Sequence, residues 1–493
     1  MFAEVLQNVF SIPSILWMNI GIAAGIIVGA LPGLTGTMAI ALLLPVTYGM
    51  DSIYAMMLLL GVYCGGIYGG SITAILINTP GTPASAATAL DGYPMARKGL
   101  GKRALHHALG ASLVGGLLSV AVLIVAAPAI AKVALSFGSR EYFALAVFGL
   151  TIIASVGGGS MIKGLLMGFL GLLLSVVGID SLDGVSRLTF GNIYLEGGFS
   201  IIPVLIGLFA ITEIMNKTRT VHHPVGEAIA VGNEKVSLRD VLKHKMVLLK
   251  SSIIGVFIGA LPGTGAALSA FLAYNEAHRA SKHPEEYGKG SEEGLIAAES
   301  ANNAVTGATL IPMLTLGIPG DTNTAVMLGA LTMQGIQPGP RLFTTQQTWV
   351  YTIMLGLIII NLFMYLQGRV FIKGFVNITK VPVNLLVPVL VVLCMIGAYT
   401  VKFNVFNCVA MIVIGLLGYL LQKLEFPLTP MVIGLVLGNL CESNMRRALL
   451  RSRGNWMTFF ESPVAAAFLI LAVLMLFLPT IRAWRAKRKQ SAT

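Results

Sequence analysis

Two stretches of the chain, Gly29–Gly36 and Gly259–Ala266, begin with the same sequence, Gly-Ala-Leu-Pro-Gly, and interrupt apolar segments. Two further interruptions, Asn78–Ser85 and Gly317–Thr324, combine Pro and Gly with hydroxyl and amide side chains. Proline and glycine break the hydrogen-bond ladder of a helix and leave backbone groups without partners. In a membrane such groups persist only beside protein or a water-filled cavity. The four breaks therefore predict an internal site for a polar ligand.

The residue types at the breaks suit an anionic substrate. Backbone N–H groups at the N-terminus of a half-helix donate hydrogen bonds and present a partial positive charge without a buried ionised group. Short hydroxyl and amide side chains add neutral donors beside them. The candidate substrate-binding residues are Thr35, Asn78, Thr79, Gly81, Thr82, Ser85, Gly320, Thr322, Asn323 and Thr324. Each residue could instead only cap a broken helix, but the mirrored clusters favour at least one substrate site.

The same oxygen atoms and unwound carbonyl groups suit Na⁺, a hard cation that requires neither thiolate nor imidazole ligands. Glu299 lies in an apolar segment, where a charged side chain costs about 2.5–3.5 kcal/mol and usually has a function. A polar contact between helices is the alternative for Glu299. The candidates for cation binding or coupling are Glu299, Asn302, Asn303, Gly33, Gly263 and Thr264. No cofactor is expected besides the coupling cation.

The composition is typical of a membrane protein. Of the 493 residues, 56% are hydrophobic and only 11% are charged, whereas soluble chains carry roughly 25% charged residues. Apolar segments long enough to cross a bilayer follow one another, which predicts an all-α polytopic membrane protein. The net charge of +12 comes from links and the C-terminal tail, so we expect no nucleic-acid binding. The four cysteines lack metal-ligand spacing, so no transition-metal site is expected.

The breaks divide the chain into two repeats. Pro32 and Pro262 are 230 residues apart, and Pro80 and Pro319 are 239 residues apart. The order of the two breaks is therefore preserved at a nearly constant offset. The predicted domains are a first repeat at 1–215, a cytoplasmic link at 216–250, a second repeat at 251–462, and a last transmembrane helix with a basic cytoplasmic tail at 463–493.

The distribution of basic residues indicates that the two repeats are inverted, with broken helices or re-entrant hairpins. The link 96–107 is basic, whereas its counterpart 334–347 has a single arginine. Conversely, 276–293 contains three Lys or Arg residues and its counterpart 47–52 has none. Because basic links stay in the cytoplasm, corresponding links face opposite sides. The arginines of 446–453 do not fit, unless they form an interfacial helix or the segment count differs by one.

Several long motifs resemble the large membrane subunit of tripartite tricarboxylate transporters, the TctA family, over about residues 20–463. These motifs are Asn78–Ser85 with Asp91–Ala96, and Glu299–Ala304 with Leu316–Gly320 and Gln337–Phe343. The resemblance implies a secondary transporter of the bacterial inner membrane that imports a di- or tricarboxylate together with a cation. It also implies two partners, a small four-helix membrane subunit and a periplasmic protein that delivers the substrate.

Other functions are less consistent with the sequence. A stand-alone organic-anion carrier or a channel is the alternative to a tripartite importer. An enzyme within the membrane is not expected, because the apolar segments contain no His pair, no nucleophile–base arrangement and no pair of Asp residues.

Overall fold

The computed structural model describes residues 1–31, 34–156, 160–180, 182–220, 236–263, 265–378 and 383–490. These residues are almost entirely helical, and β1 (Gly178–Ile179) and β2 (Ser186–Arg187) form a short antiparallel ribbon. The helices long and apolar enough to cross a membrane are Ile12–Gly29, Ser52–Ile77, Ser85–Ala134, Gln347–Ile372 and Val405–Lys423. The fold is therefore that of an all-α polytopic membrane protein, as predicted.

The described chain forms two compact units. Unit 1 contains residues 1–132 and 205–419, and unit 2 contains residues 133–204 and 420–493. Each unit combines segments from both halves of the sequence. The units group residues by contact, whereas the predicted domains group them by repeat, so the repeat boundaries stay a prediction.

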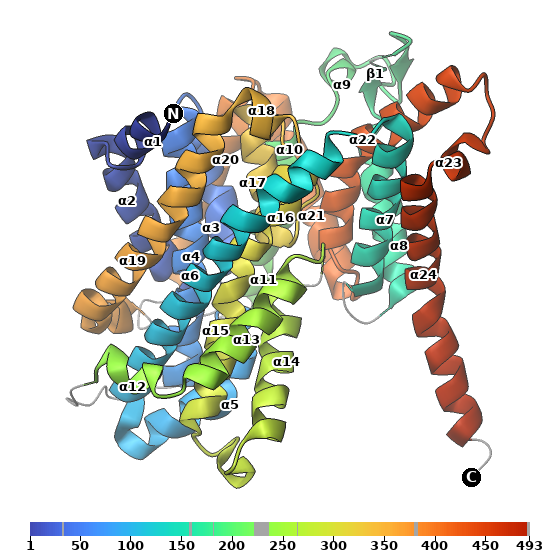
Figure 1. Ribbon diagram of the computed structural model, residues 1–493. Coiled ribbons are helices and arrows are strands. Elements are labelled where there is room, and N and C mark those ends of the chain that lie inside the picture. Colours follow the sequence, from blue (N-terminus) through green and yellow to red (C-terminus); the bar gives the residue numbers. More distant parts are fainter. Residues whose placement is uncertain are drawn as a thin grey trace. The chain divides into compact units, whose positions relative to one another are not determined.

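Unit 1 contains both pairs of breaks (Figure 1). Its helices, of which α6 and α21 extend a few residues into unit 2, are α1 (Phe2–Val9), α2 (Ile12–Gly29), α3 (Gly36–Leu43), η1 (Leu44–Thr47), α4 (Ser52–Ile77), α5 (Ser85–Met95), η2 (Ala96–Leu100), α6 (Gly101–Ala134), η3 (Ile206–Ile211), α11 (Thr212–Thr220), α12 (Leu238–Leu242), α13 (Lys245–Gly259), α14 (Gly265–Ala280), η4 (Pro284–Glu286), α15 (Glu292–Ala308), α16 (Leu310–Leu316), α17 (Thr322–Met333), α18 (Leu342–Thr345), α19 (Gln347–Ile378), α20 (Val383–Thr400) and α21 (Val405–Lys423).

Residues 55–77 of helix α4 are all buried inside unit 1. The helix is apolar on every side, as expected of a helix that packs against protein all around. Its glycines let α2 approach closely, because a Cβ atom on Gly65 would lie 2.4 Å from the carbonyl oxygen of Ile22. From the other helix, a Cβ atom on Gly25 would lie 2.4 Å from the oxygen of Val62. The two helices therefore pack backbone against backbone, as small residues allow in membranes.

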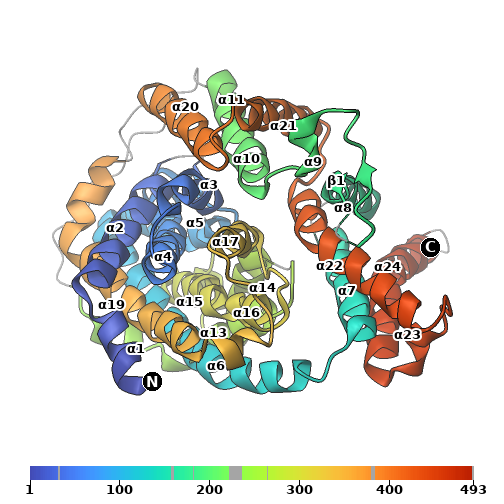
Figure 2. The same ribbon diagram turned by 90° about the horizontal axis from the view of Figure 1, so that it is seen from above.

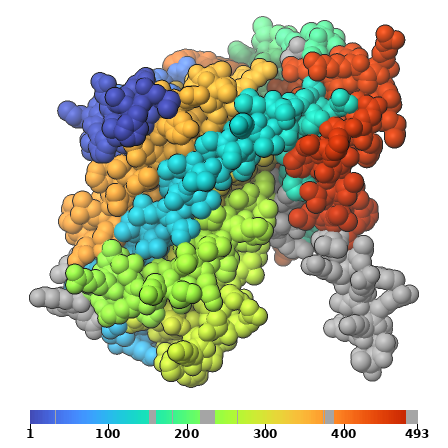
Figure 3. Space-filling model, viewed as in Figure 1, coloured from blue at the N-terminus to red at the C-terminus, as the bar shows by residue number. Residues whose placement is uncertain are grey.

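The second half repeats this packing. Helix α13 packs against α15 as α2 packs against α4, and a Cβ atom on Gly255 would lie 2.5 Å from the oxygen of Ala301. Helix α3 packs against α17, and α14 packs against α5. Each helix that follows a first break thus contacts the helix that follows the second break of the other half. Figure 2 shows α4, α15 and α17 together inside unit 1, and Figure 3 shows α6 crossing one face between α19 and α13.

The basic links lie together at one end of unit 1. The Nζ atom of Lys98 donates to the carbonyl oxygen of Lys289 at 2.6 Å, and the Nε atom of Arg103 lies 2.6 Å from Oε1 of Glu292. His244, in the link before α13, lies 3.7 Å from the other oxygen of Glu292, and this carboxylate raises the pKa of the imidazole. Links that are far apart in sequence therefore share one aqueous side.

The two links with few basic residues also lie together. Nε2 of Gln334 donates to the carbonyl oxygen of Thr47 at 2.6 Å, and α18, in the same link as Gln334, lies at the end of unit 1 that is uppermost in Figure 1. Corresponding links of the two halves thus occupy opposite ends of unit 1, and the inverted repeats stay a prediction. The predicted basic link 96–107 is itself helical, since η2 and the start of α6 continue α5 through a kink at Gly99 (φ 82°).

Cysteines placed at Lys98 and at Thr345 should react with a membrane-impermeant maleimide from opposite sides of the membrane. We expect Lys98→Cys to be labelled only from the cytoplasm, because basic links are retained there, and Thr345→Cys only from outside. Labelling is compared in intact cells and inverted vesicles, with the wild-type chain as the control for the native cysteines. Labelling of both positions from one side would contradict the topology.

Unit 2 is a smaller helical bundle. Its helices are α7 (Ser139–Val156), α8 (Met161–Ser175), α9 (Ile193–Glu196), α10 (Ile201–Leu205), α22 (Thr429–Arg451), α23 (Thr458–Glu461) and α24 (Pro463–Gln490). Helices α8 and α22 pack closely, because a Cβ atom on Gly171 would lie 2.0 Å from the oxygen of Met431.

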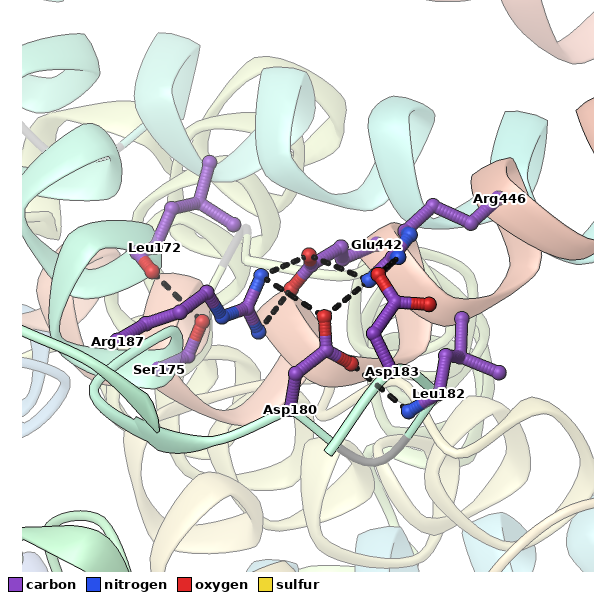
Figure 4. A network of polar contacts seen from close by, with 8 residues as sticks. All are labelled: Leu172, Ser175, Asp180, Leu182, Asp183, Arg187, Glu442 and Arg446. Carbon is purple, nitrogen blue, oxygen red and sulfur yellow. Dashed lines mark hydrogen bonds and ion pairs between the residues drawn. The ribbon is translucent and has the colours of Figure 1, made fainter. Parts of the chain in front are cut away.

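Arg446, the first of the arginines of 446–453 that do not fit the charge pattern, is paired with acidic residues. Helix α22 continues without a break to Arg451, and Arg446 pairs with Asp180 and Asp183 in the segment after α8 (Figure 4). The Leu182 N–H group and the Arg446 guanidinium lower the pKa of Asp180. Arg446 therefore belongs to an ion-pair network in which acidic side chains neutralise its charge.

Candidate substrate and cation site

The first break of one half meets the second break of the other half inside unit 1. Thr37 lies in the first turn of α3, and its Oγ1 atom donates to Oδ1 of Asn323 at 2.8 Å. The same hydroxyl lies 3.1 Å from Oγ1 of Thr322. Thr322 and Asn323 form the first turn of α17. Two helix starts from different halves are therefore joined through uncharged polar side chains.

Close backbone contacts connect the two breaks within each half. The N–H group of Gly263 donates to the carbonyl oxygen of Gly320 at 2.8 Å. In the first half, a Cβ atom on Gly81 would lie 2.3 Å from the carbonyl oxygen of Gly29. Glycine is required at Gly81 because the backbone at the end of α2 leaves no space for a side chain. Together with the Thr37 contacts, these approaches bring all four breaks into one region.

The carboxylate of Asp321 accepts several hydrogen bonds at the second-half break. Its Oδ1 atom accepts hydrogen bonds from the N–H group of Thr324 at 2.8 Å and from the Thr324 hydroxyl at 2.7 Å. Its Oδ2 atom accepts from the Tyr63 hydroxyl at 2.8 Å and from Nδ2 of Asn323 at 3.1 Å. The Tyr63 hydroxyl also lies 3.1 Å from Oγ1 of Thr309. The buried carboxylate is thus stabilised by neutral donors at a helix N-terminus, and no Lys or Arg of the described chain pairs with it.

The first-half break has a related cap without a carboxylate. The N–H group of Thr82 donates to Oγ of Ser85 at 3.1 Å, and the N–H group of Ser85 donates to Oγ1 of Thr82 at 3.3 Å. Asn78 ends α4 in the left-handed conformation (φ 53°), and both Asn78 and Thr79 are exposed. In the described structure no hydrogen bond joins Asn78 or Thr79 to Thr322, the residue expected to face them.

The remaining candidates at the breaks differ in what the structure shows of them. Thr35 is the N-cap of α3, where its Oγ1 atom accepts from the N–H group of Met38 at 3.2 Å. This contact is the capping role that was the alternative to substrate binding. Gly33 and Thr264 lie outside the described residues.

Glu299 is completely buried among hydroxyl groups from three other helices. Its Oε1 atom accepts hydrogen bonds from Ser71 on α4, at 2.6 Å, and from Thr88 on α5. Its Oε2 atom accepts from Ser112 on α6 at 3.1 Å and from Nδ2 of Asn303 at 3.5 Å. Within the described ranges no Lys, Arg or His forms an ion pair with Glu299. The carboxylate is therefore held by neutral donors, without a counter-ion of the protein.

Several buried polar atoms beside Glu299 have no hydrogen-bond partner among the described residues. They are both amide atoms of Asn302, Oδ1 of Asn303 and the hydroxyl of Tyr68. Buried polar groups nearly always have partners, so unpaired groups indicate a position for water, an ion or a ligand. Asn302 and Asn303 therefore present polar atoms near Glu299 that form no hydrogen bond with the described residues. The described part of the chain contains no group of three or more His, Cys, Asp or Glu side chains placed to hold a metal ion.

Five contributors to these networks were not predicted, namely Tyr63, Ser71, Thr88, Ser112 and Thr309. They are isolated polar residues in apolar helices, and no motif marks them in the sequence. Asp91 has a structural role, since its Oδ1 atom accepts from the N–H groups of Gly290 at 2.8 Å and Ser291 at 2.9 Å. Asp91 therefore caps the start of α15.

A polytopic helical fold with broken helices that meet around buried hydroxyl, amide and carboxylate groups is that of a membrane transport protein. Residues 15–433 match the family model of the tripartite tricarboxylate transporter TctA family. The chain belongs to this family. It is a membrane subunit of a tripartite tricarboxylate transporter, and it is not an enzyme.

Two relatives from Agrobacterium vitis are similar in sequence. One is described as an uncharacterized 52.8 kDa protein in the TAR-I ttuC' 3'region, and it is 40% identical over 477 residues, 96% of this chain and 95% of the relative. The other is described as an uncharacterized protein in the TAR-II ttuC' 3'region, and it is 38% identical over 236 residues. That alignment covers 48% of this chain and 98% of the relative. No solved structure matches this chain.

Proposed function

We propose that this subunit imports a di- or tricarboxylate across the bacterial inner membrane and is driven by Na⁺. A periplasmic binding protein delivers the substrate, and a small four-helix membrane subunit completes the complex. The observation that carries the proposal is the convergence of four helix breaks around buried neutral donors, since such donors bind a carboxylate without an additional buried charge.

The proposed carrier is built from two inverted repeats with broken helices. The opposite placement of corresponding links supports this architecture, as does the crosswise packing of α3 with α17 and α14 with α5. The second repeat then presents to one side of the membrane what the first presents to the other. Such symmetry is how many secondary transporters alternate the access to a site near the bilayer midplane.

In this proposal the substrate and the cation use different polar groups. The substrate contacts the starts of α5 and α17, where Gly81, Thr82, Ser85 and Thr322 lie. Glu299 and Asn303 couple the cation to this movement, assisted by backbone groups of the Leu-Pro-Gly breaks. Oxygen-rich broken helices without a membrane-buried histidine at the breaks favour Na⁺ over H⁺.

The coupling ion is tested by uptake into proteoliposomes that contain the subunit together with its two partners. We expect citrate or succinate uptake to require an inward Na⁺ gradient and to persist when the pH gradient is abolished. Uptake that persists without Na⁺ and stops when only the pH gradient is removed would contradict Na⁺ coupling. Liposomes with the subunit alone are the control, and full uptake there would contradict the tripartite requirement. Counterflow of labelled substrate distinguishes a carrier from a channel.

A further inference from the structure

The second breaks of the two halves make the same close contact with the helix that precedes them. The offset of 239 residues that relates them pairs Gly81 with Gly320 and Gly70 with Thr309. A Cβ atom on Gly81 would lie 2.7 Å from Cα of Gly70, and a Cβ atom on Gly320 would lie 2.7 Å from Cα of Thr309. The two breaks therefore cross the preceding helix in the same way, and positions related by this offset are structurally equivalent there.

The two breaks also share a reciprocal pair of hydrogen bonds, although Asp321 is the N-cap of α17 whereas Thr82 lies three residues before the start of α5. The N–H group of Thr82 donates to the hydroxyl of Ser85 at 3.1 Å, and the N–H group of Asp321 donates to the hydroxyl of Thr324 at 2.9 Å. In return, Ser85 N–H donates to Thr82 and Thr324 N–H donates to Asp321. Asp321 has a second carboxylate oxygen, which Thr82 lacks. The first turn of α5 contains no acidic residue at all.

In the second half, the second carboxylate oxygen accepts from the hydroxyl of Tyr63. The same offset places Asn302 at the position equivalent to Tyr63. Asn302 is completely buried, and both of its amide atoms are unpaired among the described residues. Asn302 of the second half thus corresponds to Tyr63 of the first half as a buried donor, but the first-half break has no carboxylate for it to bind.

The helix register independently places Asn302 beside the start of α5. Helices α5 and α15 run antiparallel, because Asp91 near the end of α5 contacts Ser291 at the start of α15, and Thr88 contacts Glu299. One turn further toward the start of α5 is Ser85, and one turn further along α15 is Asn302. The unpaired amide is therefore level with the N-terminus of α5.

We propose that a carboxylate group of the substrate binds at the N-terminus of α5, in the position that the Asp321 carboxylate occupies at α17. It accepts a hydrogen bond from Nδ2 of Asn302 and takes over the N–H and hydroxyl donors of Ser85, which bond Thr82 in the structure, and the partial positive charge of the helix start favours it. The α17 terminus is already neutralised by Asp321, so it does not bind substrate in the same way. This inference rests on the proposed carboxylate function and assigns the carboxylate site to one of two equivalent positions.

The substitution Thr82→Asp tests the proposal, because it copies the Asp321 cap into the first half. We expect at least hundredfold weaker binding of citrate, since the new carboxylate occupies the site and repels the substrate. The melting temperature without ligand should not fall, because the equivalent cap is stable at α17. Thr82→Asn adds no charge and should bind at least tenfold more tightly than Thr82→Asp. Thr344→Asp adds the same charge at an exposed position of the short helix α18 and should bind as the wild type does.

Asn302→Ala tests the second donor independently and decides the matter if Thr82→Asp does not fold. Loss of a hydrogen bond to a charged group should weaken binding about 10- to 100-fold. Binding of citrate and succinate is measured by calorimetry on the purified chain in lipid nanodiscs with saturating Na⁺. A wild type that binds neither of them would overturn the proposed carboxylate function. A wild type that binds, with Thr82→Asp or Asn302→Ala within threefold of it, would overturn this site and leave the function standing.

Discussion

Glu299→Gln is expected to reduce Na⁺-driven net uptake at least a hundredfold while substrate exchange continues. Glu299 is the buried acid that three hydroxyl groups of α4, α5 and α6 contact. Glutamine keeps a carbonyl oxygen as an acceptor for these hydroxyl groups but removes the negative charge that attracts the cation. A carrier without its coupling charge can still exchange substrate for substrate, because exchange does not require the empty carrier to return.

The measurement compares net uptake with counterflow in the same proteoliposomes. The matched control is Glu286→Gln, which removes an exposed acid from the link after α14 and should leave both rates unchanged. Glu299→Ala should also lower the melting temperature, because each buried hydroxyl left without its acceptor costs about 1–3 kcal/mol. Equal loss of uptake and counterflow in Glu299→Gln, with normal stability, would show that this residue serves substrate binding rather than coupling.

Gly65→Ala is expected to prevent accumulation of the folded protein, or to lower its melting temperature strongly. The added methyl group would meet the carbonyl oxygen of Ile22 at 2.4 Å, and neither backbone can move without separating α4 from α2. Overpacking usually costs about 1–3 kcal/mol where side chains can adjust, and a rigid backbone adjusts less. Such a loss is a large share of the roughly 5–15 kcal/mol by which folded proteins are stable.

Fluorescence-detected size exclusion and thermal unfolding in detergent measure this effect. Gly168→Ala is the matched control, since Gly168 also lies in an apolar helix but has no atom within 4 Å of the added methyl group. We expect Gly168→Ala to fold normally and to gain slightly from the better helix propensity of alanine. Normal folding of Gly65→Ala would contradict the close packing of α2 and α4.

The features that the sequence predicted well are those with local signals. Proline and glycine mark the ends of α2, α4 and α13 directly, and the excess of lysine and arginine identified the links that the structure places at one end of unit 1. Glu299 was recognisable because an ionised group in an apolar segment is unusual. These signals depend on single residues and their neighbours, so a sequence without relatives is sufficient.

The partners of these residues could not be predicted, because they come from distant helices. Ser71, Thr88 and Ser112 are ordinary hydroxyl residues until α4, α5 and α6 bring them to one carboxylate. Asp321 could be read only as a possible cap, since its contact with Tyr63 crosses from the second half to the first. Asn78, one of the candidates for substrate binding, ends α4 as an exposed left-handed residue, a conformation in which asparagine is tolerated.

The burial of α4 affects how a genetic screen for lost transport should be interpreted. Every position from Ala55 to Ile77 is buried in protein, so substitutions along this stretch will be recovered as loss-of-function alleles, with glycines such as Gly61 and Gly69 prominent among them. Most of these alleles will lower the amount of protein in the membrane rather than its turnover. Only alleles with normal abundance, of which Ser71 and Tyr63 are the expected examples, will identify positions that take part in transport itself.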